Sequence, residues 1–264
     1  MGKTASKRID TLLAERGLAG SRTSAAKSIR AGHVRIGRDG PVAVKPGQLV
    51  PEDAELLLAE RPRYVSRGGL KLENAIAALG FEVTGRDCLD VGASTGGFTD
   101  CLLKHGAARV IALDVGHGQL DARLREEPRV TVMERFNARD LGPEDLPFPP
   151  GLVTADVSFI SLAKLLPAMA RCLSPEGGLV ALVKPQFELG RERVGKGGVV
   201  REAADRHEAL RSVASAAADA GLAVLGFASS GLPGPKGNRE SFIHCSREAH
   251  GVGDIEAAVR EVEP

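Results

Sequence analysis

The stretch "CLDVGASTGGFTD", residues 88–100, joins a short hydrophobic run to a glycine-rich turn and then to a segment with helical periodicity. An apolar run bounded by turn residues is typical of a buried β-strand, and we expect the helix to begin near Phe98. This strand, turn and helix form the first unit of a doubly wound α/β sheet. Such sheets bind ligands beyond the carboxyl ends of their strands, so the turn is a candidate binding site.

Three classes of ligand compete for this turn. A phosphate-binding loop, G-x-x-x-x-G-K-[ST], fits the spacing of Gly92 and Gly97, but Phe98 stands where the lysine is required. A dinucleotide fingerprint, G-x-G-x-x-G, needs a glycine where Ser94 stands, so that a pyrophosphate can approach the backbone. S-adenosylmethionine has no pyrophosphate and does not require that spacing, so we predict S-adenosylmethionine as the cofactor. An ordinary structural turn is the alternative.

Polar residues at the ends of the first three strands would complete this site. We expect Asp90 to accept a hydrogen bond from the ligand's ammonium group, directly or through water, and Asp114 to bind the ribose hydroxyls. Asn137 or Asp140 would face the adenine edge. The predicted cofactor-binding set is Asp90, Gly92, Ser94, Gly96, Gly97, Phe98, Asp114, Asn137 and Asp140.

Helices and strands alternate along the rest of residues 69–264, which we predict to be one α/β domain with a Rossmann-like doubly wound sheet. Five strands with helical crossovers are expected to run parallel, and the last two to pair antiparallel at one edge. The expected helices are 70–79, 98–105, 118–126, 161–173 and 202–220. The expected strands are 87–91, 109–115, 129–134, 151–157, 178–184, 222–228 and 241–246.

The N-terminal part of the chain is much more basic than the whole. Residues 1–48 carry ten Lys and Arg against three Asp and Glu, a net charge of +7, whereas the complete chain carries +1. Clustered positive charge indicates a polyanionic partner such as nucleic acid, and a well-solvated terminal domain is the alternative. We predict a separate α+β domain over residues 1–60 and a basic linker over 61–68.

Two helices and three short strands are expected in this N-terminal domain. The first helix, 8–16, ends at Gly17, and the second, which Ser21 can cap, is closed by Gly32. The expected strands are 33–36, 42–44 and 55–60. The pattern "RID..L...GLA.SR..A...I..G.V.I" with a later "VKPG" resembles the small RNA-binding domain of ribosomal protein S-four, which implies that the basic second helix contacts structured RNA.

Four ionisable residues are expected at the rim where the cofactor would lie. "ADVSFISL" supplies Asp156 after the fourth strand, "LVKPQFE" supplies Lys184 after the fifth, and "GPKGNRE" supplies Glu240 before the last. "SRGGLKLENA" adds Lys71 at the start of the helix preceding the first strand. Each residue alone is readily explained as structural, but together they form a Lys-Asp-Lys-Glu set that this fold brings to one rim.

The sequence resembles the TlyA (haemolysin A) family of rRNA 2′-O-methyltransferases, whose catalytic domain is similar to that of FtsJ-type ribose methyltransferases. The motifs "YVSRGGLKL", "DVGASTGGFTD", "ALDVGHGQL", "ADVSFISL", "LVKPQFE", "GKGGVVR" and "GPKGNRE" carry this resemblance over nearly the whole chain. It implies that Lys71, Asp156, Lys184 and Glu240 are the catalytic tetrad. It also implies a cytidine ribose of 23S rRNA as the substrate and, in longer family members, one of 16S rRNA.

Basic residues in both domains are expected to contact this RNA, and the loop 190–200 is expected to form an RNA-facing flap, with a plain connector as the alternative. The predicted RNA-binding residues are Arg8, Arg22, Lys27, Arg30, Arg35, Lys45, Arg67 and Lys196. Aromatic residues are scarce, so phosphate contacts should dominate, although a flipped target base could meet Phe159 or Phe187.

Other features bear on location and on competing functions. The chain has no long apolar run and no secretory signal, so we expect a cytoplasmic protein that does not act on membranes. Its four cysteines are 13, 71 and 73 positions apart, which gives no metal-binding pair, so we expect buried thiols and no metal site. A non-catalytic ribosome-assembly factor and a membrane-active haemolysin are the alternatives; calorimetry with S-adenosylmethionine tests the first and liposome leakage the second.

Overall fold

The computed structural model divides the chain into two compact units, Met1–Arg63 and Tyr64–Pro264. It describes residues 5–30, 33–38, 40–43, 45–58, 63–195, 197–247 and 250–263. Within these ranges no helix is both long and apolar enough to cross a membrane.

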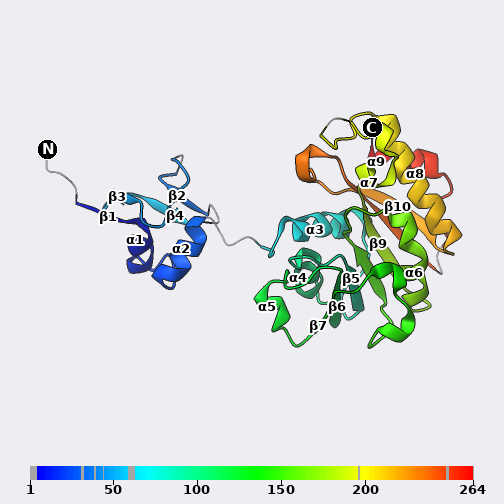
Figure 1. The fold of residues 1–264 in the computed structure, drawn as a ribbon, viewed down its shortest axis with the longest axis horizontal. Helices are drawn as coiled ribbons and strands as arrows, with labels where there is room; N and C mark the ends of the chain where they lie inside the picture. Colours follow the sequence, from blue (N-terminus) through cyan, green and yellow to red (C-terminus); the bar gives the residue numbers. More distant parts are fainter. Residues whose placement is uncertain are drawn as a thin grey trace. The chain divides into compact units, whose positions relative to one another are not determined.

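The first unit packs two helices against short antiparallel strands (Figure 1). Its elements are β1 (Ser6–Arg8), α1 (Ile9–Glu15), α2 (Arg22–Arg30), β2 (Val34–Ile36), β3 (Leu49–Pro51) and β4 (Leu56–Leu58), with β1 paired to β3 and β2 paired to β4. Ile9, Leu13 and Ile29 bring the inner faces of both helices into one core. The side chain of Ser21 accepts a hydrogen bond from the Ser24 amide and so caps α2 as predicted.

The strands of this unit differ from the predicted ones. The β1–β3 pair was not predicted, because three-residue strands carry too little alternation to be recognised. In the expected strand 42–44, Val42 forms only an isolated bridge with Arg35, and residue 44 lies outside the described residues, as does Gly32. Gly17 adopts a φ of +68°, which is the left-handed conformation expected after α1.

The second unit is built on a seven-stranded sheet with the order β10-β11-β9-β8-β5-β6-β7. Its strands are β5 (Asp87–Val91), β6 (Arg109–Asp114), β7 (Val130–Glu134), β8 (Leu152–Ala155), β9 (Gly178–Val183), β10 (Ala223–Ser229) and β11 (Ser241–Ser246). The first five strands run parallel, and β11 is antiparallel to both of its neighbours. The predicted doubly wound sheet with an antiparallel pair at one edge is therefore confirmed.

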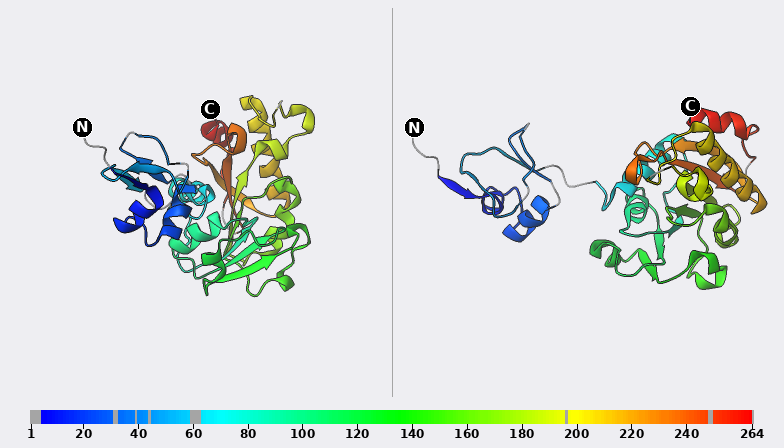
Figure 2. Two further views of the ribbon diagram at one scale, coloured as in Figure 1. Left: turned by 60° about the vertical axis from the view of Figure 1, so that its left-hand side comes forward. Right: turned by 45° about the horizontal axis from the view of Figure 1, so that its top comes forward.

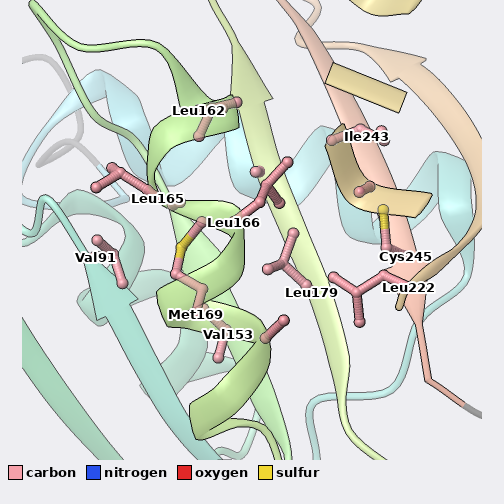
Figure 3. Packing of buried hydrophobic residues seen from close by; sticks show 14 of the residues in the cluster. Val91, Val153, Leu162, Leu165, Leu166, Met169, Leu179, Leu222, Ile243 and Cys245 are labelled. Carbon is pink, nitrogen blue, oxygen red and sulfur yellow. The ribbon is translucent and has the colours of Figure 1, made fainter. Parts of the chain in front are cut away.

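Helices cover both faces of this sheet (Figures 1 and 2). One face carries α3 (Arg67–Leu79), α4 (Gly97–Lys104) and α5 (Ala122–Arg125), and the other carries α6 (Leu166–Cys172), α8 (Ala203–Asp219) and α9 (Ile255–Val262). Figure 3 shows part of the hydrophobic core on the face covered by α6, α8 and α9. Side chains of α6, among them Leu166 and Met169, pack there toward the strand residues Val153 and Leu179. All four cysteines are buried, as predicted.

Several helices differ from the predicted ones near the candidate site. Of the expected helix 118–126, only the single turn of α5 is helical. The Asp121 side chain accepts a hydrogen bond from the Arg123 amide and caps α5, so the helix begins there and the residues before it form a loop. The expected helix 161–173 is divided into a 3₁₀ turn, Leu162–Lys164, and α6. The short helices α7 (Pro185–Glu188) and α9 were not predicted, since four and eight residues give little helical periodicity.

Candidate active site

The glycine-rich turn after β5 borders a cavity of about 600 Å³ at the carboxyl ends of the parallel strands. Gly92 has a φ of +82°, and a Cβ atom there would lie 2.7 Å from the carbonyl oxygen of Asp156, so a side chain is excluded. Ser94 also lines the cavity and adopts a φ of 48°. The missing side chain at Gly92 lets the turn after β5 pass close to the turn after β8, and Gly92 and Asp156 both line the cavity.

Asp114, at the end of β6, connects two turns at the cavity wall. Its Oδ2 accepts a hydrogen bond from the Ser94 amide at 2.8 Å, and its Oδ1 accepts one from the Gly116 amide at 2.6 Å. Asn137 lines the same cavity, whereas Asp140 is exposed and is not among the lining residues. Of the two candidates for the adenine edge, Asn137 is therefore better placed.

Asp90 lies behind the turn and lines neither this cavity nor the smaller one described below. Its Oδ2 accepts hydrogen bonds from the amide of Thr99 at 2.9 Å and from its hydroxyl at 2.7 Å, which fixes the start of α4. Burial raises the pKa of Asp90 to about 7; the Thr99 hydrogen bonds oppose this shift, and the charge of Asp156 adds to it. The predicted contact between Asp90 and a ligand ammonium stays a prediction.

The remaining members of the turn pack closely against α3 and α5. A Cβ atom on Gly96 would lie 2.2 Å from a Leu124 methyl group, and one on Gly97 would lie 2.2 Å from Ser66 Oγ. Phe98 is buried 5.9 Å from the Phe242 ring and lines the smaller cavity. Gly96 and Gly97 thus allow the helices to approach the turn.

Lys184 and Asp156 form an ion pair at the ends of neighbouring parallel strands. Lys184 Nζ lies 2.6 Å from Asp156 Oδ1 and donates a hydrogen bond to Ser158 Oγ at 3.0 Å. Lys184 is buried and is followed by Pro185, which begins α7. Asp156 and Ser158 therefore hold the Lys184 ammonium group in one position at the strand ends.

Lys71 and Glu240 form a second, more deeply buried pair. Lys71 Nζ donates to Glu240 Oε2, and the side chains are 7% and 0% exposed. The other oxygen, Glu240 Oε1, has no hydrogen-bond partner among the described residues. A Cβ atom on Gly234 would lie 2.0 Å from this oxygen, so Gly234 leaves room for the carboxylate.

The two pairs meet at a second cavity, of about 230 Å³, lined by Lys71, Asp156 and Lys184. It shares four lining residues with the larger cavity, which are Gly92, Ser94, Asp156 and Ser158. Three predicted tetrad members thus line one cavity, and the fourth, Glu240, is bonded to Lys71. Ser158 was not predicted, although it lies in the quoted motif two residues after Asp156.

Seven of the predicted RNA-binding side chains lie in the described part of the chain, and all seven are exposed: Arg8, Arg22, Lys27, Arg30, Arg35, Lys45 and Arg67. The Asp10 carboxylate lies 2.7 Å from the Arg8 guanidinium and 3.7 Å from that of Arg22. Its negative charge partly neutralises the two arginines and so reduces the positive charge that they offer to RNA. Arg67 donates to the carbonyl of Pro233 and lines the smaller cavity.

Part of the loop 190–200 is attached to the domain. Asn238 donates to the carbonyl of Gly198 at 2.7 Å and accepts from the amide of Val200 at 2.9 Å. Lys196 lies outside the described residues. The predicted flap therefore has a fixed C-terminal end at residues 198–200.

The sheet order, its single reversed strand, and two adjoining cavities at the strand ends define the class of Rossmann-like methyltransferases. The family model of the FtsJ-like methyltransferase matches residues 64–247, and the model of the S4 domain matches residues 7–56. The chain belongs to the TlyA family of rRNA 2′-O-methyltransferases, as its resemblance predicts.

Named relatives and a solved structure cover most of the chain. The 16S/23S rRNA (cytidine-2′-O)-methyltransferase TlyA of Mycobacterium tuberculosis is 51% identical over 89% of this chain and 88% of its own length. Hemolysin A of Brachyspira hyodysenteriae is 40% identical over 90% of this chain and 98% of its own length. A solved structure from Streptococcus thermophilus is 41% identical, with a TM-score of 0.74 over 98% of this chain and 96% of that chain.

Proposed function

We propose that the protein transfers a methyl group from S-adenosylmethionine to the ribose 2′-hydroxyl of a cytidine in ribosomal RNA, with 23S rRNA as the main substrate and 16S rRNA as a second one. The observation that carries this proposal is the position of the Lys184–Asp156 and Lys71–Glu240 pairs at a small cavity that adjoins a larger one. The proposed substrate implies the cytoplasm as the location.

The larger cavity fits S-adenosylmethionine in size and in the polar groups around it. A volume of about 600 Å³ is within the range of cofactor sites. The lining combines apolar side chains such as Phe136 and Ile160 with the Asp114 carboxylate, the Asn137 side chain and the backbone of Gly92. Asp114 would bind the ribose hydroxyls and Asn137 the adenine edge. When bound, the cofactor supplies an electrophilic methyl group on a sulfonium centre.

The tetrad would align the 2′-hydroxyl and manage its proton. A ribose hydroxyl is a weak nucleophile, so transfer requires alignment and at least partial deprotonation. Lys184 Nζ, held by Asp156 and Ser158, can accept the proton as a neutral amine or stabilise the developing oxyanion as an ammonium. Lys71 on α3 lines the same cavity, and Glu240, which directly precedes β11, holds the Lys71 ammonium group there.

RNA would be held by charge on the first unit and by an aromatic pair on the second. The exposed side chains of Arg22, Lys27 and Arg30 follow α2 and suit phosphate contacts. Phe159 is 92% exposed, lines the larger cavity, and lies 5.3 Å from the Phe187 ring. An exposed aromatic ring beside a catalytic cavity is well placed to stack on a base that is flipped out of an RNA helix.

Asp114→Ala is expected to weaken S-adenosylmethionine binding by about tenfold or more, because it removes both the ribose contact and the hydrogen bonds that connect the Ser94 and Gly116 amides. Calorimetric titration with the cofactor measures the change. Asp140→Ala is the matched control, since Asp140 does not line the cavity. Equal affinity of wild type and Asp114→Ala would contradict the assignment.

Phe159→Ala is expected to lower kcat/KM for the RNA substrate by roughly tenfold to hundredfold, because stacking of a base on an aromatic ring contributes about 1–3 kcal/mol. The affinity for free S-adenosylmethionine, titrated separately, should fall much less. Methylation at a series of RNA concentrations measures the effect. An unchanged kcat/KM would exclude Phe159 as a base contact.

Primer extension at low dNTP concentration tests the proposed function in cells. Ribosomal RNA from cells that contain the protein should give a reverse-transcription stop at a 2′-O-methylated cytidine, and RNA from cells without it should not. The same stop pattern in both samples would contradict the proposal. A stop restored by wild type but not by Lys184→Ala would connect the modification to this site.

A further inference from the structure

The loop after β8, residues 156–162, and the turn after β9, residues 184–188, are joined by contacts along their length. Near the cavity, Lys184 contacts Asp156 and Ser158, and further out the rings of Phe187 and Phe159 pack together. At the far end Glu188, the last residue of α7, binds the loop again. The predicted tetrad accounts for the first contacts but assigns no role to Glu188.

Glu188 uses both carboxylate oxygens on the loop. Its Oε2 accepts from Ser161 Oγ at 2.6 Å, and its Oε1 accepts from the Leu162 amide at 2.9 Å. Ser161 in turn accepts from the Ala163 amide and caps the 3₁₀ turn that follows. Burial raises the pKa of Glu188 above its usual value, and the two hydrogen bonds from the loop oppose this shift. These hydrogen bonds therefore offset part of the cost of burying the carboxylate.

The segment between Ser158, which contacts Lys184, and Ser161, which contacts Glu188, includes a residue with an unfavourable backbone conformation. Phe159 has a φ of +65°, a left-handed conformation that costs an aromatic residue about 1–2 kcal/mol. Phe159 is 92% exposed, so burial of this residue does not stabilise the conformation. The neighbouring segment is held instead at Ser158 by Lys184 and at Ser161 and Leu162 by Glu188.

We propose that Glu188 is a positioning residue for methyl transfer, which holds the 156–162 loop so that Phe159 stays at the cavity and Ser158 stays on Lys184. Glu188 lines neither cavity, so it acts through the loop and does not touch the substrate. This inference rests on the proposed function, because Phe159 and Lys184 act on the RNA substrate only if that function is correct.

A set of variants tests the inference by single-turnover methylation of ribosomal RNA at saturating cofactor. Glu188→Ala is expected to lower the rate by about tenfold, since small displacements of positioned groups are costly. Glu188→Gln should stay within about threefold of wild type, because its amide can accept from Leu162 and donate to Ser161. Glu208→Ala is the matched control and should keep the wild-type rate, since Glu208 forms an ion pair with Arg211 on α8 and lines neither cavity.

A double-mutant cycle separates positioning from general destabilisation. In a Phe159→Ala background, Glu188→Ala should cost no more than about threefold, because the ring it positions is gone and only its support of the Ser158–Lys184 contact remains. An equal loss in both backgrounds, or a wild-type rate for Glu188→Ala, would overturn the inference. If wild-type protein itself methylates no RNA, the proposed function fails; if wild type is active and Glu188→Ala equals it, only the role of Glu188 fails.

Discussion

Lys184→Met is expected to lower the rate of methyl transfer by about 10²–10⁴-fold, the range typical for loss of a group that handles the proton in the transition state. Methionine keeps most of the apolar stem of lysine and removes the ammonium group that contacts Asp156 and Ser158. Lys184 lines the smaller cavity and not the larger one, so cofactor affinity should change much less than the rate. Single-turnover methylation and calorimetry measure the two quantities.

Lys164→Met is the control for Lys184→Met, because Lys164 is an exposed lysine of the same domain. It should methylate at the wild-type rate. A Lys184→Met protein that is folded, binds S-adenosylmethionine and methylates at the wild-type rate would exclude Lys184 from the chemistry.

Glu240→Ala is expected to lower the free energy of unfolding by about 3–5 kcal/mol, because it leaves the buried Lys71 ammonium without its partner. The double variant Lys71→Met/Glu240→Leu should recover much of that loss, since two apolar side chains of similar size replace the buried ion pair. Both proteins should be strongly impaired in methylation. Urea unfolding monitored by circular dichroism measures the stability.

The comparison of these two variants separates stability from catalysis at the Lys71–Glu240 pair. If the double variant recovers stability and also methylates at the wild-type rate, the pair is structural and the predicted tetrad reduces to Lys184 and Asp156. A Glu240→Ala protein as stable as wild type would contradict the buried ion pair itself.

Most of the sheet could be predicted because the parallel strands are short, mostly apolar runs bounded by turn residues. Asp114, Asp156 and Lys184 follow such runs directly, so their meeting at one rim depended only on the strand order. The short elements were missed for the opposite reason: β1, β3 and α7 hold three or four residues each, and their formation depends on contacts with distant parts of the chain.

The direction of a side chain was harder to predict than the position of its residue. Asp90 lies on β5 as expected, but its carboxylate turns to Thr99 and away from both cavities. The contacts of Ser158 and Glu188 also join segments about 26 residues apart, which leaves no local pattern in the sequence. Hydrogen bonds of this kind appear only once the sheet has brought the strand ends together.

The most direct test of the proposed activity is to incubate the purified protein with methyl-labelled S-adenosylmethionine and unmodified ribosomal subunits, and to identify the labelled nucleoside by mass spectrometry. Wild-type protein should produce labelled 2′-O-methylcytidine, and Lys184→Met should produce at most a small fraction of it. Absence of any labelled nucleoside, or label on a base instead of a ribose, would contradict ribose methylation by this site.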